Sequence, residues 1–540
     1  MKHGLHKEIQ TLDSMAEKQQ TIASAPASLR SEILLVLGLV LSVFLLTSAG
    51  FDASEGTYDY RIAHLILTQG ALGFATPAEG MFEDGGCTYL APNGRTYAYH
   101  EFGNALFLLP AAAVNIVLEK ALTNHLDQRR MGFVTGFTAS LMPVIYCALT
   151  IVLFYAMLRI SFRKSIATAL TASMALAFCT FVWTYSRNLY DGVLCMCILT
   201  GAILSLLQFR RTMKLKFFLI AMALGGLGVV TRLTMALVLP AFLVYLTMVF
   251  WKDRKRLIQL VLIGITVLIP FAAWQTYYNH LRTGHWLIAP VMSDQYASTS
   301  GLTGDPVSGM IGLLFMPGKS IFLFIPLALL SIICFRRFMT SYPMEATLAA
   351  LLSGMWLLIH AKLAADWYGA WGWGPRHFIT IAPVLALPAC VCWEWMKESW
   401  WRRILLVGAL TWGAVLTVSS IIGNWHFRMA LGDAEGRHDA MLWSLSDGQP
   451  IDMIKGALSN LRNIALHLPG PYLNTYSPIN RYASNTVNVW INSAAYAGVP
   501  KLLLGAVTLA LLAIASYCLI ALLRIIRKSP EMELLSPHEA

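Results

Sequence analysis

The sequence predicts an all-α protein that crosses a membrane many times. Of its 540 residues 57% are hydrophobic and only 13% are charged, whereas about a quarter of the residues in a soluble domain carry charge. Long apolar runs recur along the chain, and short clusters of Lys and Arg follow alternate runs. These observations exclude an ordinary soluble protein. They also make the position of the charges more informative than their sum of +11.

Apolar runs of spanning length, roughly 20 residues of helix, predict twelve transmembrane helices. They cover residues 33–50, 133–157, 166–183, 190–207, 217–230, 234–250, 257–275, 320–335, 346–361, 377–393, 404–422 and 501–523. With residues 1–32 inside, every short basic cluster except Arg129–Arg130 falls on the cytoplasmic side, as the positive-inside rule requires. We therefore expect both ends of the chain in the cytoplasm.

Residues 104–119 form one more apolar run, which contains Pro110. If this run crossed the membrane, every later basic cluster would be turned outward. We therefore expect it to be an interfacial helix on or within the outer leaflet.

Nearly all residues outside the membrane are then on the outer side, so the protein is expected to act there. The expected organisation is a cytoplasmic N-terminal tail 1–32, a main transmembrane module 33–422 with a first outer loop 51–132, a small outer subdomain 423–500, a last transmembrane helix 501–523 and a cytoplasmic tail 524–540.

Carboxylates gather where the chain leaves the first span, at Asp52, Glu55 and Asp59. Asp52 could cap the amphipathic helix expected at 54–69, because Asp is a common N-cap residue. It could instead be a general base, held at the membrane surface to take a proton from an acceptor hydroxyl. Glu55 and Asp59 lie one turn apart on one helix face, where both could simply be solvated.

Asp191 stands where an apolar run resumes, and a carboxylate at the mouth of a span must meet a cation or water. Arg187, four residues earlier, could pair with it in an ordinary ion pair. Alternatively, Asp191 could face a cavity that it shares with the first outer loop.

The stretch DWYGAWGWGPRHF, residues 366–378, interleaves aromatic residues with three glycines before Pro375 and Arg376. An aromatic belt at the headgroup level would explain the tryptophans, but it does not need glycines, which let a backbone approach a ligand closely. Arg376 can bind a phosphate with two donors. Lys319 and Arg232 lie at other outer mouths, where each could be structural or could bind a lipid phosphate.

The sequence contains no HExxH, Walker or dinucleotide-binding motif. The pair His100–Glu101 alone is weak evidence for a metal site.

These features together resemble the GT-C superfamily of polytopic glycosyltransferases, which includes protein O-mannosyltransferases and the aminoarabinose transferases of lipid A. The resemblance covers roughly residues 33–422. It rests on the acid past the first span and on the stretches YRIAHLILTQGALGF, YAYHEFGNALFLLPAAAV, NLYDGVLC, LLFMPGKSIFLF and WYGAWGWGPRHF. Familiar members often have adjacent Asp and Glu, whereas Ala53 and Ser54 separate Asp52 from Glu55 here. We expect Asp52 to be the base, with Glu55 as the alternative.

The resemblance implies a GT-C-like fold and a cell-envelope enzyme that transfers a sugar from a polyprenyl-phosphate donor to an outer glycan, lipid or protein acceptor. It implies an inverting transfer at the outer face of a bacterial inner membrane, without metal or cofactor. The residues it assigns are Asp52 and Glu55 as catalytic, and Asp191, Arg232, Lys319, Trp371, Trp373 and Arg376 as substrate-binding.

Two other functions fit the same composition. A transporter or flippase of a lipid-linked saccharide would form no bond, but transporters usually carry ionisable groups at mid-membrane and show internal pseudo-symmetry. A polysaccharide polymerase or ligase is expected to use outer-face arginines without a first-loop acid.

Overall fold

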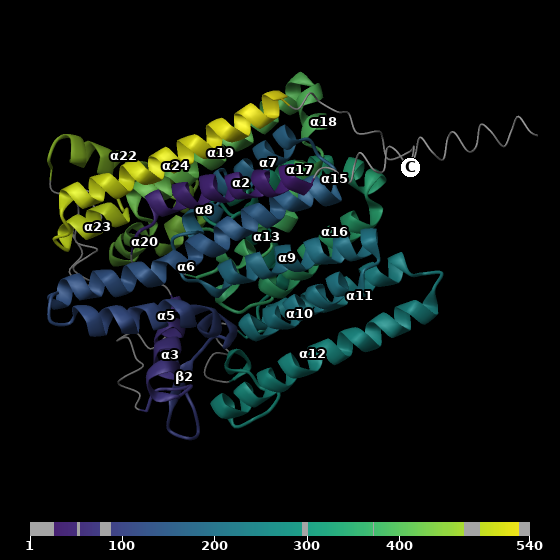
Figure 1. Cartoon of the computed structure of the whole chain (residues 1–540), viewed down its shortest axis with the longest axis horizontal. Coiled ribbons are helices and arrows are strands. Elements are labelled where there is room, and N and C mark those ends of the chain that lie inside the picture. The colour runs from purple at the N-terminus through teal and green to yellow at the C-terminus, as the bar shows by residue number, and fades with distance from the viewer. Residues whose placement is uncertain are drawn as a thin grey trace, which may run out of the picture.

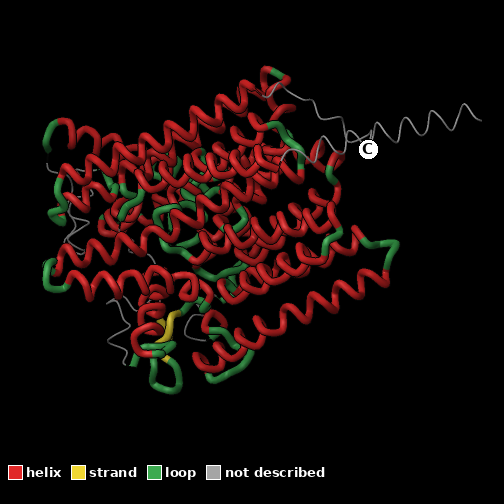
Figure 2. The backbone as a smooth tube through the Cα atoms, viewed as in Figure 1, coloured by secondary structure: helices red, strands yellow, loops and turns green. Residues whose placement is uncertain are grey.

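The computed structural model describes residues 26–50, 55–75, 88–293, 301–370, 372–468 and 487–528. Most of the long helices lie roughly along one axis (Figure 1). One short hairpin forms the only sheet in the described chain, and loops join the helices (Figure 2). Eight helices are long and apolar enough to cross a membrane, by length and composition. The predicted class, an all-α multi-pass membrane protein, is confirmed.

Every run predicted to span lies on one helix or on consecutive short helices. The elements are α2 (Pro26–Thr47), α6 (Gln128–Ala156), α7 (Ile166–Phe178), α8 (Val182–Tyr185), α9 (Asp191–Thr212), α10 (Leu215–Thr231), α11 (Val238–Val249), α12 (Arg254–Thr283), α14 (Ile321–Phe324), α15 (Pro326–Ser341), α16 (Pro343–Ala361), α17 (Ala382–Val391), α18 (Trp393–Glu398), α19 (Trp400–Gly423) and α24 (Lys501–Lys528). Several are shorter than a bilayer is thick, so the number of spans, twelve, stays a prediction.

The first outer loop folds into a helix and a hairpin at one end of the bundle (Figure 1). Helix α3 (Gly56–Gln69), close to the predicted 54–69, ends where Gly70 adopts a left-handed conformation with φ 66°. Strands β1 (Thr88–Leu90) and β2 (Thr96–Ala98) pair antiparallel, with Tyr89 opposite Tyr97. The hairpin packs its Tyr97 against Tyr278 of α12.

The run predicted to be interfacial is α5 (Gly103–Leu122), which is also long and apolar enough to span. It lies antiparallel to α6: Tyr146 donates to the carbonyl of Phe107 (3.0 Å), and Asn115 donates to that of Thr135 (2.9 Å). Phe107, near the start of α5, thus meets α6 at Tyr146, and α5 begins before it reaches the level of Arg159, which follows the far end of α6. This position supports the interfacial placement, which stays a prediction.

Helix α13 (Pro306–Phe315) was not predicted and lies between the predicted spans 257–275 and 320–335. The Asp305 carboxylate accepts from the backbone amides of Val307 (3.2 Å) and Ser308 (3.0 Å), and Pro306 takes the first helical position. Asp followed by Pro before an apolar run is a helix-start signal, so the sequence contained this information.

The described part of the segment 423–500 consists of helices that pack onto the bundle, and its assignment as an outer subdomain stays a prediction. It contains α20 (Trp425–Ala434), α21 (His438–Trp443), α22 (Gln449–Ala465) and α23 (Trp490–Tyr496). Trp425, Met429, Met441 and Met453 belong to the same hydrophobic core as the transmembrane helices. The described part of this segment therefore helps to build the end of the bundle where α3 and the hairpin lie (Figure 1).

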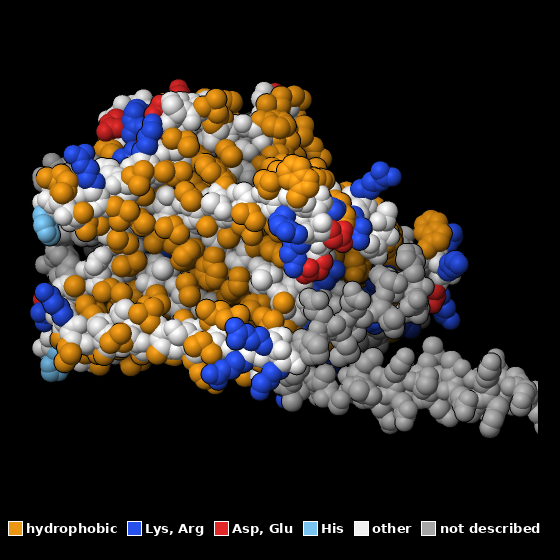
Figure 3. All heavy atoms as spheres, turned by 90° about the horizontal axis from the view of Figure 1, so that it is seen from above, with side chains coloured by type: hydrophobic (Ala, Val, Ile, Leu, Met, Phe, Trp, Pro, Cys, Tyr) orange, Lys and Arg blue, Asp and Glu red, His pale blue; other side chains and the backbone are white. Residues whose placement is uncertain are grey.

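The surface matches a lipid environment. Hydrophobic side chains cover the middle of the face in Figure 3, and charged side chains lie mainly toward its two ends. On α24, Leu502 is 88% and Leu509 68% exposed. Contiguous apolar surface of this extent is rare on soluble monomers, whereas it is needed on helices that face lipid.

We expect the end with α3 and the hairpin to face outward. In a Cys87→Ser background, Gly85→Cys and Asp439→Cys should react with an impermeant thiol reagent added outside intact cells, and Arg254→Cys should not. The reason is that α12 begins at Arg254, at the basic end opposite α3 (Figure 1). Outside labelling at position 254 would reverse the orientation.

Candidate active site

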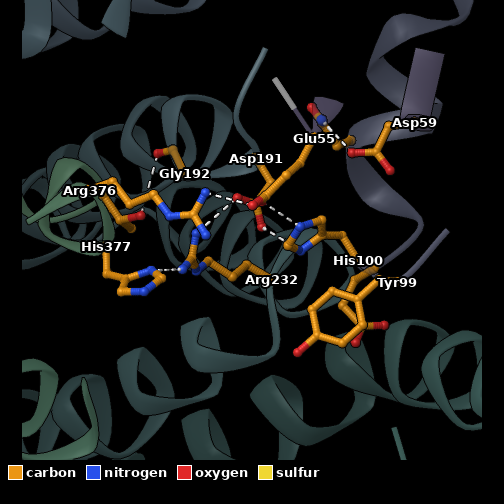
Figure 4. A network of polar contacts seen from close by, with 12 residues as sticks. Glu55, Asp59, Tyr99, His100, Asp191, Gly192, Arg232, Arg376 and His377 are labelled. Atoms are coloured by element: carbon orange, nitrogen blue, oxygen red, sulfur yellow. Dashed lines mark hydrogen bonds and ion pairs between the residues drawn. The ribbon is translucent and has the colours of Figure 1, made fainter. Parts of the chain in front are cut away.

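Charged side chains from five distant parts of the chain meet at the end of the bundle that carries α3 (Figure 4). The Glu55 carboxylate accepts from Nη1 of Arg376 (2.6 Å) and lies 2.8 Å from Nε2 of His100. Nδ1 of His100 is 4.0 Å from the Asp191 carboxylate, which accepts from Nη1 of Arg232 (2.8 Å). We call these five residues the polar network.

Glycine at position 56 brings Glu55 into this network. Glu55 is the N-cap residue of α3, and Gly56 lies against Leu189 in the turn between α8 and α9. A Cβ atom at position 56 would lie only 1.9 Å from the carbonyl oxygen of Leu189. Only a residue without a side chain allows this approach. The turn that leads into Asp191 therefore sets the position of Glu55.

A buried arginine holds His100 in place. Arg282, at the end of α12, donates to the carbonyls of Tyr99 (3.0 Å) and His100 (2.9 Å) and pairs with Glu101 (2.6 Å). In the sequence, His100 belongs only to a bare His–Glu pair, which is weak evidence for a metal site. Its role depends on the tertiary contact between the first outer loop and α12.

Asp191 pairs with Arg232 and not with Arg187. Asp191 is the first residue of α9, so Arg187 precedes the helix and the i, i+4 ion pair does not form. Arg232, just after α10, also places Nη2 2.7 Å from Nδ1 of His377. Of the two readings that the sequence left open, the structure favours the one that places Asp191 beside the first outer loop, through His100.

The glycine-rich stretch forms a tight turn that carries Arg376. Gly369 (φ 85°) and Gly374 (φ 60°) adopt left-handed backbone conformations that favour glycine. The Arg376 guanidinium reaches from this turn to Glu55 and lies 5.2 Å from the ring centre of Tyr190. The glycines thus place the arginine through backbone geometry.

Lys319 lies under this turn and is 0% exposed. Its Nζ donates to the carbonyls of Ala370 (3.1 Å), Gly372 (2.5 Å) and Gly374 (3.2 Å). Burial, with the nearby charge of Arg376, keeps the pKa of Lys319 well below its usual value. Its donors are used inside the turn, which differs from the expectation that Lys319 contacts a phosphate directly.

Trp373 also lies inside the protein. It is 1% exposed, packs edge-on against Phe324 with ring centres 5.0 Å apart, and accepts a hydrogen bond from Tyr185 on its carbonyl (2.8 Å). This position differs from the expectation that its ring stacks on a sugar. Asp52 and Trp371 lie outside the described residues.

Gln449, from the C-terminal segment, closes the turn from the other side. Its Oε1 accepts from the amide of Gly374 (2.8 Å), and its Nε2 donates to the carbonyl of Gly372 (3.1 Å). Sequence reasoning missed this residue, because nothing near Gln449 distinguishes it from a surface glutamine. The structure places it at the start of α22, buried against the turn.

Burial and charge tune the titratable groups. Burial would raise the pKa of Glu55, but Arg376 and His100 outweigh it and hold that pKa below its usual range. Burial would lower the pKa of His100, but Glu55 and neighbouring carboxylates raise it to about 9. Burial raises the pKa of Asp59 to about 7 although Asn104 donates to its carboxylate (2.7 Å). Neither Glu55 nor Asp59 is simply solvated on the face of α3.

The polar network therefore has three cations, Arg232, Arg376 and protonated His100, against two carboxylates, Glu55 and Asp191. The formal charge of these five residues is therefore +1, and the nearby Asp59 carboxylate also acts on His100. Such a group of donors, preorganised in a partly buried site, is suited to hold an anion such as a phosphate.

The glycine turn gives a direct test. We expect Gln449→Met to weaken the binding of an anion at Arg376. The substitution removes both hydrogen bonds to the turn while the side-chain volume stays nearly the same. Each lost bond to a buried partner costs about 1–3 kcal/mol. The matched control is Asn460→Leu on the same helix, whose side chain donates to Ile422 rather than to the turn. The thermal unfolding temperature should change in both variants, whereas anion affinity should fall in Gln449→Met alone. Equal anion affinities in the two variants would contradict the role of Gln449 in placing Arg376.

Comparison with known proteins links the chain to a group of enzymes. The family model of dolichyl-phosphate-mannose-protein mannosyltransferases matches residues 130–274. The predicted resemblance to the GT-C glycosyltransferases is confirmed. The match to this GT-C family runs from α6 into α12 and includes Asp191 and Arg232, whereas Glu55, His100 and Arg376 lie outside it.

Comparison with solved structures gave matches with low TM-scores. Among solved structures, ArnT from Cupriavidus metallidurans bound to undecaprenyl phosphate has a TM-score of 0.47 and 12% identity, over 86% of this chain and 87% of that chain. The same protein in its apo state has a TM-score of 0.44 and 14% identity, over 86% and 85%. No curated protein sequence matches significantly.

Proposed function

We propose that this protein transfers a sugar from a polyprenyl-phosphate donor to an acceptor on the outer face of the membrane. The observation that supports it most is the Glu55–Arg376 pair inside a network with a surplus cation. A carboxylate and a guanidinium in contact at the end of a membrane bundle supply the base and the phosphate ligand that such a transfer needs. The likeness to GT-C glycosyltransferases points to the same chemistry.

The donor phosphate would bind against Arg376 and Arg232. Both guanidiniums lie in one network with the surplus positive charge, and phosphate is a good partner for their planar donors. During transfer, the bond between the sugar and the phosphate oxygen breaks and negative charge grows on the leaving polyprenyl phosphate. Fixed cations stabilise that charge without reorganising. The prenyl chain would lie in the membrane.

Glu55 would act as the general base. While Arg376 pairs with Glu55, the low pKa makes this carboxylate a weak base. A phosphate that binds Arg376 offsets its charge, so the pKa of Glu55 rises and proton transfer to it becomes more favourable. The acceptor oxygen then attacks the anomeric carbon from the face opposite the phosphate, and its proton passes to Glu55. This in-line attack inverts the sugar. Asp52 remains the alternative base.

Lys319 and Trp373 would act through the turn. Lys319 organises three turn carbonyls, and Trp373 anchors the turn in the core. Both then fix the position of Arg376, as positioning residues. Trp371 remains a candidate for sugar contact, and Asp191 would orient Arg232 and His100.

The test uses the full-length protein in nanodiscs with radiolabelled short-chain polyprenyl-phosphate hexoses and an envelope extract of the source organism as acceptor. We expect polyprenyl phosphate to be released in step with label incorporation into the extract, with Glu55→Gln as the inactive control. Passage of intact donor across a liposome bilayer, with no bond cleaved, would favour a flippase and overturn the proposal.

A further inference from the structure

Arg187 is a buried cation that the polar network does not use. It lies in the turn between α8 and α9 and is 3% exposed. Its Nη2 donates to the carbonyl of Asn488, and its Nε is buried without a hydrogen-bond partner. Burial alone lowers the pKa of Arg187, to about 10, and no carboxylate of the described chain offsets that effect.

Two other arginines show that the missing counter-ion sets Arg187 apart, since the Nε of buried Arg282 also has no hydrogen-bond partner among the described residues. Arg282, also fully buried, pairs with Glu101, and Arg428 on α20 pairs with Asp452 through Nε at 3.0 Å. A buried guanidinium that lacks a counter-ion costs several kcal/mol. Buried charged groups with perturbed pKa values cluster at functional sites.

The surroundings of Arg187 supply further polar groups and no described acid. The amide of Asn188 lies 3.2 Å from Nε2 of His426, at the start of α20. Burial, together with the charge of Arg187, lowers the pKa of His426 to about 3, so this imidazole is neutral. His426 and Asn488, both of the C-terminal segment, therefore contact the α8–α9 turn at Asn188 and Arg187.

The same short turn connects Arg187 to the polar network. Leu189 packs against Gly56, next to Glu55, and the ring of Tyr190 lies by Arg376. The turn ends in Asp191. Four residues of chain span at most about 14 Å. The Cα atom of Arg187 therefore lies within about 14 Å of that of Asp191, a member of the polar network.

We propose that Arg187, beside Asn188 and His426, binds an anionic group of a substrate whose reacting atom lies at Glu55. This group is a phosphate or a carboxylate. The inference rests on the proposed function for the identity of that substrate. The anion belongs to the acceptor or to a second charged group of the donor, and both sources offer the same chemistry. The C-terminal segment thereby becomes part of substrate recognition.

The test is equilibrium dialysis of radiolabelled inorganic phosphate against the full-length protein in phosphatidylcholine nanodiscs, which carry no anionic lipid. Arg187→Gln should weaken phosphate binding about tenfold or more, because it removes a charge-assisted donor. Arg428→Gln is the matched control, an arginine of the same region that already has its carboxylate, and should bind phosphate as the wild type does. Unchanged phosphate binding in Arg187→Gln overturns the proposal.

If Arg187→Gln fails to fold, Arg187→Lys takes its place: it keeps the charge but loses the planar fork, so its phosphate affinity should fall. A wild-type value for Arg187→Lys then overturns the proposal. Saturation with a short-chain polyprenyl phosphate separates the two sources. If Arg187-dependent phosphate binding persists in the presence of saturating polyprenyl phosphate, the site belongs to the acceptor. If it is lost, the site belongs to the donor.

Arg376→Gln distinguishes a failure here from a failure of the proposed function. If polyprenyl phosphate does not bind through Arg376 while inorganic phosphate still binds through Arg187, the proposed function falls and the anion site stands. If Arg187 is without effect while Arg376 binds polyprenyl phosphate, only the anion site falls.

Discussion

Glu55→Gln is expected to slow sugar transfer on the order of a hundredfold or more, with the protein still folded. The amide keeps the size of the side chain and one oxygen for Arg376, but it removes the charge and the proton-accepting group. Because α3 has no side-chain cap at Glu55, the substitution removes no helix cap. The measurement is the initial rate of label transfer at saturating donor, alongside thermal unfolding.

Two variants make this result specific. Glu119→Gln on α5 changes a carboxylate that lies 3.6 Å from His64, away from the polar network, and should transfer at the wild-type rate. Asp52→Asn tests the alternative base. If Asp52→Asn is inactive and Glu55→Gln is active, the base is Asp52. Normal transfer in both variants would remove the first-loop acids from the mechanism.

Arg376→Gln is expected to weaken binding of the polyprenyl-phosphate donor by roughly ten- to a hundredfold, as a charge-assisted hydrogen bond is worth about 1.5–3 kcal/mol. It should also slow the chemical step, because the leaving phosphate loses a cation. Arg376→Lys keeps the charge but loses the planar pair of donors, so its donor affinity should lie between those of the wild type and Arg376→Gln. Donor affinity is measured by competition with labelled polyprenyl phosphate; an unchanged value would exclude Arg376 from the donor site.

The same variant has a signature in pH. In the wild type the Glu55 pKa is depressed, so its ion pairs contribute stability that is present above the unfolded value of about 4.3 and is lost as pH falls through the lower folded pKa. Without Arg376 the pKa of Glu55 rises. The acid limb of the pH–rate profile should therefore move to higher pH in Arg376→Gln, which a merely structural loss would not do.

The class of protein follows from the sequence because lipid imposes a simple rule: residues that face it are apolar, and the charges at the ends are sorted by sign. The helix at 54–69 could be read for a similar reason, from its amphipathic pattern. Local signals also marked α13, where Asp305 and Pro306 begin the helix. Such features depend on neighbouring residues, so one chain is enough to reveal them.

The partners in the site could not be read in this way. Glu55 meets Arg376 across 321 positions of the chain, and Asp191 takes Arg232 instead of the nearer Arg187. The resemblance implied that Lys319 and Arg376 both bind substrate, because the sequence does not distinguish the two cations. Only the fold shows that one cation is enclosed by turn carbonyls and the other faces the carboxylate.

The sequence by itself thus determined the membrane class, the long apolar helices and most of the chemically important residue types, because those depend on hydropathy and local propensity. The tertiary structure decided which charges pair, which are buried and which have no counter-ion among the described residues. It brought His100, Gln449 and Arg187 into consideration, none of which lies in a distinctive motif. The physical reason is that electrostatic energy depends on distance and burial, and long-range packing sets both.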